Sequence, residues 1–277
     1  MTTVSQAQAA VAQSKRRYWW HKYGPLTMGV LGIVLALLVW QVYAVFGPVN
    51  RHHLPPPTEV IPTFLRSLTL SEFWVAIGQT MTAWALGLAI SIVSALLVGL
   101  VIGSSRVLRV WTHSTVEFLR PIPAVGLIPV AALLFGPRIG AELMIIVFAC
   151  FWIIVIQVIY GIADVDKVAR ETARTMRMGQ VDMVKYLVFP TLLPYLVTGI
   201  RLAATVALIL AVTVELIVGT PGLGHQVAQA QINDSPPAMF ALIITTGLLG
   251  ILINFVTRFI ANRVLFWHAS VRGEVRA

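Results

Sequence analysis

Six long apolar runs separated by polar segments constrain this chain more than any other feature of its sequence. The first run, Leu26–Phe46, has 21 residues and no charged side chain, and a helix needs about 20 residues to cross a bilayer core. Of the whole chain, 58% is hydrophobic and 11% is charged, whereas a soluble domain averages about 25% charged residues. The sequence therefore predicts an all-α polytopic membrane protein.

We expect each run to form a transmembrane helix, six in all, because backbone N–H and C=O groups in lipid must bond within the protein and a helix satisfies them all. The predicted spans cover residues 26–46, 75–102, 116–135, 143–162, 192–218 and 238–266. They form one transmembrane domain, 25–268, between an N-terminal tail, 1–24, and a C-terminal tail, 269–277. A signal peptide is the alternative for the first run, but its apolar region would have only about 7 to 15 residues. Pro121, Pro123 and Pro129 predict an interrupted third span that faces protein rather than lipid.

Basic residues predict the orientation of these spans. Fourteen Lys and Arg residues flank the side that carries both termini, and only Arg51, Arg66 and Arg138 lie on the other side. Because basic residues concentrate in cytoplasmic segments, we expect both termini in the cytoplasm. The net charge of +9 does not indicate nucleic-acid binding, since the basic residues lie between apolar runs and not on one solvated face.

Motifs that carry chemistry are scarce. The one cysteine, Cys150, lies in an apolar run, which excludes an intrachain disulfide. His52 and His53 are a weak metal candidate, because no cysteine or carboxylate stands near them at ligand spacing. The sequence contains no GxxxxGK[ST] phosphate loop, nucleophile elbow or zinc-helix motif. We therefore expect no enzyme and no metal site, and energy for uphill transport would come from an ion gradient or a partner.

The polar stretch from Asp164 to Pro194 is where the chain can contact a partner in water. It holds nine charged residues between two apolar runs. Steps of three and four, the spacing of one helical face, separate Val168, Thr172, Thr175, Met176 and Gly179. The pattern predicts a short amphipathic helix that Gly179 can end, with Pro190 and Pro194 at the start of the next span. An ordinary basic cytoplasmic loop is the alternative.

Polar side chains inside the spans are candidates for a solute pathway, because they are costly in lipid. The main candidates are Gln157, Thr205, Thr213 and Glu215, and the weaker ones are Gln79 and Asn254. For Glu215 the alternative is an interhelical hydrogen bond or a gate contact near the external end. Arg201 either extends its guanidinium group to the cytoplasmic interface or attracts an anion.

The central stretch resembles the EAA loop, the cytoplasmic coupling loop of permease subunits of binding-protein-dependent ABC importers, and the nitrate, sulfonate and taurine branch matches best. Glu171, Thr172 and Ala173 stand at the Glu-Ala-Ala of the motif, with Thr172 in place of an alanine. Arg177 occupies the usual glycine position, Gly179 follows two residues later, and Phe189 replaces the leucine before Pro190. Further matches are LPPPTEV (54–60), FLRPIPAVGLIP (118–129), PYLVTGIRLA (194–203) and VELIVGTPGLG (214–224), so the resemblance covers most of the chain.

This resemblance implies a type I permease fold in the bacterial inner membrane and a translocation pathway for a small anionic solute. The coupling loop, 163–191, would dock on two cytoplasmic ATP-binding subunits, which would hold the ATP and Mg, while this chain would bind no cofactor. A second permease copy, giving a homodimer, and an extracytoplasmic solute-binding protein are the other implied partners. The residues expected to carry the coupling are Arg170, Glu171, Thr172, Ala173, Met176 and Gly179. A gradient-driven secondary carrier or channel, with Glu215 as its proton or ion site, is the alternative function.

Overall fold

The computed structural model describes residues 27–48 and 53–266, and every regular element within these ranges is helical. Both predicted tails and His52 lie outside the described residues. The chain divides into two units, Met1–Thr63 and Phe64–Ala277.

The first unit contains a helix of 20 residues, Thr27–Phe46, that is long and apolar enough to cross a membrane. It also contains most of α2 (Pro57–Ser67). Gln41 connects the two helices, since its Oε1 accepts a hydrogen bond from the Thr58 N–H at 3.3 Å and its Nε2 donates to Thr58 Oγ1 at 3.3 Å. The Gln41 side chain therefore satisfies one of the free donors at the start of α2.

Four long apolar helices make up most of the second unit: α3 (Ser71–Ser104), α6 (Ile139–Ala163), α9 (Phe189–Val218) and α11 (Pro236–Val264). The shorter elements are α4 (Arg106–Leu119), η1 (Ala124–Leu127), α5 (Ile128–Phe135), α7 (Lys167–Thr175), α8 (Gln180–Met183), η2 (Val184–Val188) and α10 (Leu223–Ile232). In the described part of the chain, five helices can each cross a membrane, or six if α4 and η1–α5 count as one bent span. The predicted all-α fold with six crossings agrees with this set.

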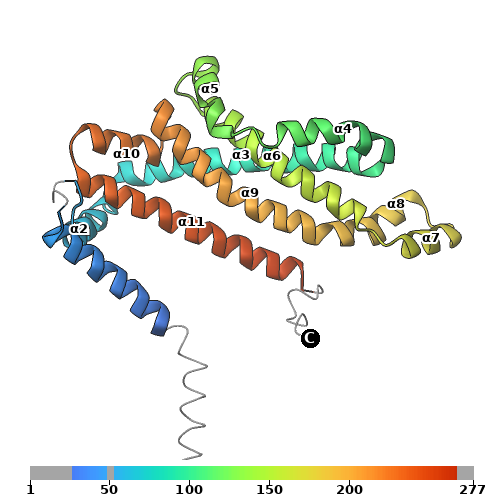
Figure 1. Cartoon of the computed structure of the whole chain (residues 1–277), viewed down its shortest axis with the longest axis horizontal. Helices are drawn as coiled ribbons and strands as arrows, with labels where there is room; N and C mark the ends of the chain where they lie inside the picture. The colour runs from blue at the N-terminus through green and yellow to red at the C-terminus, as the bar shows by residue number, and fades with distance from the viewer. Residues whose placement is uncertain (1–26, 49–52, 267–277) are drawn as a thin grey trace, which may run out of the picture. The chain divides into compact units, whose positions relative to one another are not determined.

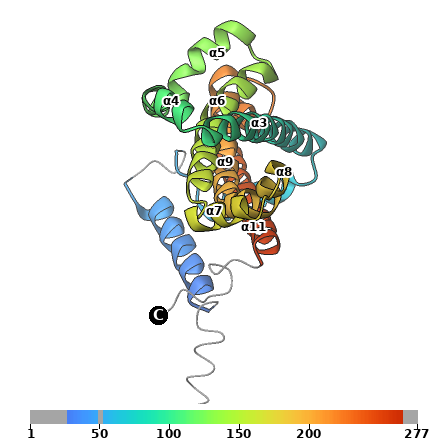
Figure 2. The ribbon, with the colours of Figure 1, turned by 90° about the vertical axis from the view of Figure 1, so that its right-hand side faces the viewer.

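The third crossing is broken, as its prolines predict, but it differs from the expected span. Its helix begins at Arg106 and not at residue 116, and it bends by 75° between α4 and η1–α5. The break contains Pro121 and Pro123, which cannot donate the backbone hydrogen bonds that would continue the helix. In both views of the ribbon, α5 and α11 lie on opposite sides of the bundle (Figures 1 and 2).

α6 packs against both α3 and α9 and forms the centre of the bundle. Glycines of α3 allow the close approach to α6. A Cβ atom added at Gly87 would lie 2.6 Å from Ile146 Cγ2, and one added at Gly99 would lie 2.6 Å from Val158 Cγ1. Small residues at helix contacts let membrane helices gain packing energy that the hydrophobic effect does not supply inside lipid.

The helix of the fifth crossing is continuous from Gln180 to Val218. It therefore begins before the predicted start at residue 192, and Pro194 lies inside it. The turn before Pro190 is a π-helix, in which the Phe189 N–H donates to the Val184 carbonyl. A widened turn of this kind is one way a helix accommodates a proline, which lacks an N–H group and crowds the preceding carbonyl.

Candidate functional site

The amphipathic helix expected in the central polar stretch is α7, which lies with α8 at one end of the bundle (Figure 1). The helix starts where the Asp166 carboxylate accepts a hydrogen bond from the Val168 N–H at 2.9 Å. This N-cap satisfies one of the free donors of the first turn. Val168 is 69% exposed and Met176 is 75% exposed. Apolar side chains grouped on an exposed helix are typical of a surface that binds a partner.

Most of the residues expected to couple the chain to a partner are accessible. Those at the surface are Glu171, Thr172, Met176 and Gly179, and Arg170 is half-buried. Ala173 is only 7% exposed and packs against its own chain. A partner can therefore touch the other residues of the set, whereas Ala173 is covered by its own chain. The coupling role of these residues stays a prediction.

α7 ends in a Schellman motif with an arginine at its left-handed position. Arg177 has a φ of 55°. Its N–H donates to the Arg174 carbonyl at 2.9 Å, and the Met178 N–H donates to the Ala173 carbonyl at 3.0 Å. These two bonds satisfy carbonyls at the helix end, and glycine is the usual residue at the left-handed position.

Gly179 does not end α7, contrary to the expectation from its conformational freedom. Its φ of −62° and ψ of 156° are ordinary extended backbone, and it is the N-cap of α8. The turn occurs two residues earlier, at Arg177. Arg177 stands at the usual glycine position of the EAA motif that this stretch resembles.

Two adjoining grooves lie along α9. The first has a volume of about 550 Å³, and its lining includes Gln157, Tyr195 and Thr198. The second has a volume of about 680 Å³, and its lining includes Thr198 and Thr205. Leu265 lines both grooves. The structure thus brings two predicted pathway residues, Gln157 and Thr205, to neighbouring polar grooves.

The other two predicted pathway residues do not line these grooves. Thr213 is half-buried, and its hydroxyl donates to the Ile209 carbonyl at 2.6 Å within α9. Glu215 is 0% exposed, and its Oε2 accepts a hydrogen bond from the Gly224 N–H at 2.8 Å. Their role in a pathway stays a prediction.

The Glu215 carboxylate belongs to a buried polar cluster that joins α3, α6 and α9 to the start of α10. Thr80 Oγ1 accepts a hydrogen bond from the Leu223 N–H at 3.0 Å. Glu142 is 2% exposed, lies next to Thr220, and is close enough to Glu215 for their charges to interact. Among the described residues, Glu142 Oε2, Glu215 Oε1 and Thr220 Oγ1 are buried without a hydrogen-bond partner.

Glu142 was not predicted from the sequence, because the fourth span was expected to begin at residue 143. In the structure α6 begins at Ile139 and includes Glu142. A carboxylate one residue before a long apolar run was the signal available. Reasoning also missed Arg258, which lines the second groove. Its position inside the sixth apolar run, at a helical spacing of four from Asn254, could have indicated it.

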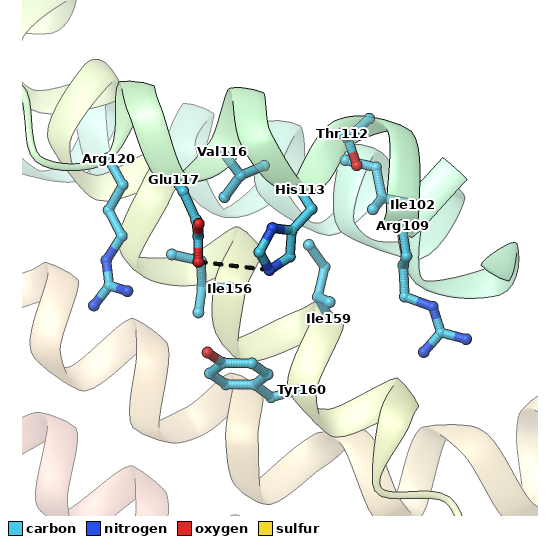
Figure 3. A pocket seen from close by; sticks show the side chains of 10 residues that line it. All are labelled: Ile102, Arg109, Thr112, His113, Val116, Glu117, Arg120, Ile156, Ile159 and Tyr160. Carbon is cyan, nitrogen blue, oxygen red and sulfur yellow. Dashed lines mark ion pairs between the residues drawn. The ribbon is translucent and has the colours of Figure 1, made fainter. Parts of the chain in front are cut away.

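A smaller pocket of about 170 Å³ lies between α4 and α6 (Figure 3). His113 and Glu117 form a pair with an Nε2–Oε1 distance of 3.5 Å. Arg109 and Arg120 also line the pocket, and Tyr160 contributes its ring from α6. Glu117 lies between the two arginines in the sequence, so the pocket carries charges of both signs.

Comparison with known proteins places the chain in a family. Residues 95–266 match the family model for the inner membrane component of binding-protein-dependent transport systems. The chain belongs to this family. The permease is 24% identical to the taurine transport system permease protein of Escherichia coli (strain K12), over 94% of this chain and 96% of that protein. It is 25% identical to the bicarbonate transport system permease protein of Synechococcus elongatus (strain ATCC 33912 / PCC 7942 / FACHB-805), over 88% and 90% of the two chains.

A solved structure shares the fold of this permease. A chain of the methionine ABC transporter MetNI, in an inward-facing conformation, superposes with a TM-score of 0.60 and 20% identity, covering 70% of the permease and 96% of that chain. The predicted type I permease fold is therefore confirmed, and the family model and the relatives confirm the predicted membership of the ABC importer permeases. It favours an ATP-driven importer over the gradient-driven carrier or channel.

Proposed function

We propose that this permease forms the translocation path for a small anion and receives its driving force through α7. The observation that carries the proposal is the exposed surface of α7 and its C-cap, where the apolar side chains of Val168 and Met176 and the charged side chain of Glu171 are all exposed. Helix-in-groove contacts bury such apolar anchors, and the charges around them set the orientation. The groove would belong to an ATP-binding subunit in the cytoplasm.

The family supports the remaining partners. A binding-protein-dependent system requires a solute-binding protein on the outer side of the membrane and a source of ATP hydrolysis on the inner side. A complete path would form between two copies of the permease, each docked on one ATP-binding subunit, with both chain termini in the cytoplasm. Closure of the ATP-binding pair would rotate the two permeases as rigid bodies and alternate access to the path.

The substrate class is supported by the relatives. One relative is named for taurine, which is a sulfonate, and another is named for bicarbonate. Both substrates carry a small oxyanion group. We therefore propose that a sulfonate, carboxylate or inorganic oxyanion passes through this permease. Gln157 and Thr205, on the two grooves along α9, would lie on its path.

Reversal of the charge at Glu171 tests the coupling. In the reconstituted importer, Glu171→Lys should lower ATP hydrolysis stimulated by the solute-binding protein by about tenfold or more, because a charge that orients the docking helix becomes repulsive. The permease should still insert and elute as a single species, since Glu171 is exposed.

Glu72→Lys is the matched control. Glu72 is exposed in the first turn of α3, near α10 and at the other end of the bundle from α7. Glu72→Lys makes the same change of charge as Glu171→Lys. It should leave stimulated ATP hydrolysis within about twofold of wild type. Equal, unimpaired hydrolysis in both variants would contradict docking through α7.

A further inference from the structure

The groove between α9 and α11 is lined by polar side chains from both helices. On α9, Thr198, Arg201 and Thr205 follow one another at spacings of three and four residues, and on α11 Asn254, Arg258 and Asn262 follow at spacings of four. Residues at these spacings share one face of a helix. The two helices lie side by side in the bundle (Figure 1). Each therefore presents a polar stripe to the same groove.

The groove lies near one edge of the bilayer core. Arg201 stands about 26 Å before the end of α9, and Asn254 stands about 27 Å after the start of α11, at a rise of 1.5 Å per residue. Since a bilayer core is about 30 Å thick, both residues are close to its inner edge. The two residues meet there, since Arg201 Nη2 donates to Asn254 Oδ1 at 3.1 Å. At this edge an arginine can reach water, so the groove can receive a solute that enters or leaves on the inner side.

The charge of the groove has one sign. Arg201 and Arg258 contribute two guanidinium groups, and none of its described lining residues is acidic. Both arginines are exposed at the surface of the single chain. The amide N–H of Asn254 can donate a hydrogen bond from the same wall. The hydroxyls of Thr198 and Thr205 donate within α9, to the Pro194 and Arg201 carbonyls, and line the groove as acceptors.

We propose that this groove is a binding site for the transported oxyanion, with Arg201 and Arg258 as its charged donors. This inference rests on the proposed function and extends it to a defined site. Guanidinium groups hold planar or tetrahedral oxyanions through paired hydrogen bonds, which ammonium groups cannot match. Asn254 holds Arg201 in place while the groove is empty, and its amide N–H donates to the anion when Arg201 turns toward it.

Cysteine reactivity tests the site without knowledge of the natural solute. Cys150 is the one cysteine of the chain and is buried, so it provides an unreactive background. Thr205→Cys places a thiol on the face of Arg201. In the full importer in phosphatidylcholine nanodiscs, it should react with the anionic ethylsulfonate methanethiosulfonate about tenfold faster than with the cationic ethyltrimethylammonium reagent, after correction for their rates with free cysteine. Taurine or nitrate at millimolar concentration should slow the reaction.

The arginines must account for this preference. Arg201→Gln or Arg258→Gln in the Thr205→Cys background should each reduce the ratio of the two rates severalfold. If one of these variants does not fold, the other provides the measurement. Arg263→Gln is the matched control, because Arg263 lies on α11 over the ring of Phe259 and outside the groove, and it should leave the ratio unchanged.

Three results would overturn the proposal. They are equal rates with both reagents, an unreactive thiol at position 205, and a preference that persists without the arginines. Protection by added phosphatidylglycerol, with none by taurine or nitrate, would assign the groove to a lipid headgroup and also overturn it. Copurification of the ATP-binding subunits tests the proposed function separately, so failure of the anion site leaves that result intact.

Discussion

The backbone N–H of Gly224 donates a hydrogen bond to the buried carboxylate of Glu215 at 2.8 Å. Gly224 lies in the first turn of α10, where N–H groups have no partner within the helix. The neighbouring Leu223 N–H is satisfied by Thr80 of α3. Two side chains from other helices thus cap α10, and the Glu215 carboxyl group lies at the positive end of the helix dipole. This arrangement ties α10 to α9 and α3.

Removal of the Glu215 carboxylate should loosen this connection. Glu215→Ala leaves the Gly224 N–H buried without a partner and should lower the free energy of unfolding of the permease by about 1 to 2 kcal/mol. Glu215→Gln keeps a side-chain oxygen that can accept the bond and should lose less. The thermal midpoint of the purified permease, compared among the three proteins, measures both effects.

Thr213→Ala is the control for that series. Thr213 also lies on α9, but its hydroxyl bonds only to the Ile209 carbonyl of its own helix. Its removal should change the thermal midpoint less than Glu215→Ala. A similar loss in both variants would argue that any polar deletion in α9 has this effect and that the cap on α10 has no special importance.

Gly224, in the first turn of α10, should not tolerate a side chain. A Cβ atom at Gly224 would collide with the Val212 carbonyl and lie 2.8 Å from Glu215 Cβ. Gly224→Ala should therefore displace α10 and reduce the yield of folded permease severalfold in fluorescence-detected size exclusion. Gly247→Ala, where nothing lies within 4 Å of the added atom, should elute as wild type.

Arg177→Gly should stabilise the end of α7. Arg177 has a left-handed backbone, which costs a residue with a side chain about 1 to 2 kcal/mol and costs glycine little. The variant should show slower hydrogen exchange at the Arg177 and Met178 amides, because their bonds to α7 carbonyls would open less often.

The comparison variant for this prediction is Arg174→Gly. Arg174 lies within α7, where glycine costs about 1 kcal/mol relative to alanine. It should speed exchange at the same amides. Faster exchange in both variants would mean that the Arg177 side chain stabilises the turn more than its backbone conformation costs.

Close packing of α3 on α6 gives a further prediction. Gly99→Ala places a Cβ atom 2.6 Å from Val158 Cγ1, and the crowded contact should destabilise the bundle by about 1 to 3 kcal/mol. Gly78→Ala on the same helix has open space around the new atom and should be neutral or slightly stabilising. The thermal midpoints of the two variants and of the wild type, in one detergent, measure both effects. Equal midpoints for the two variants would contradict the prediction.

The sequence predicted the architecture well, because lipid imposes a simple pattern on the chain. Uncharged runs of 20 residues or more have few alternatives to a membrane helix. The short helix at α7 was also predictable, since its polar and apolar positions follow the helical spacing. Both features depend on residues that are close together in the sequence.

Features that depend on partners far along the chain were not predictable in this way. The end of α7 is a local exception, because hydrogen bonds to the Ala173 and Arg174 carbonyls fix the turn at Arg177, although the residue type favours Gly179. The contact of Glu215 with Gly224 required knowledge that the chain returns to α9 after Gly219. The pairing of Arg201 with Asn254 required knowledge that α9 and α11 are neighbours.

Photocrosslinking from α7 tests the central claim most directly. A photoreactive p-benzoylphenylalanine in place of Val168 or Met176 should crosslink to the co-expressed ATP-binding subunit in inner-membrane vesicles, since both positions are exposed on α7. The same group in place of Ile232, which is exposed at the end of α10, should not crosslink to it. Absence of the crosslink from α7, or its appearance from Ile232, would contradict the proposal that α7 carries the driving force into the permease.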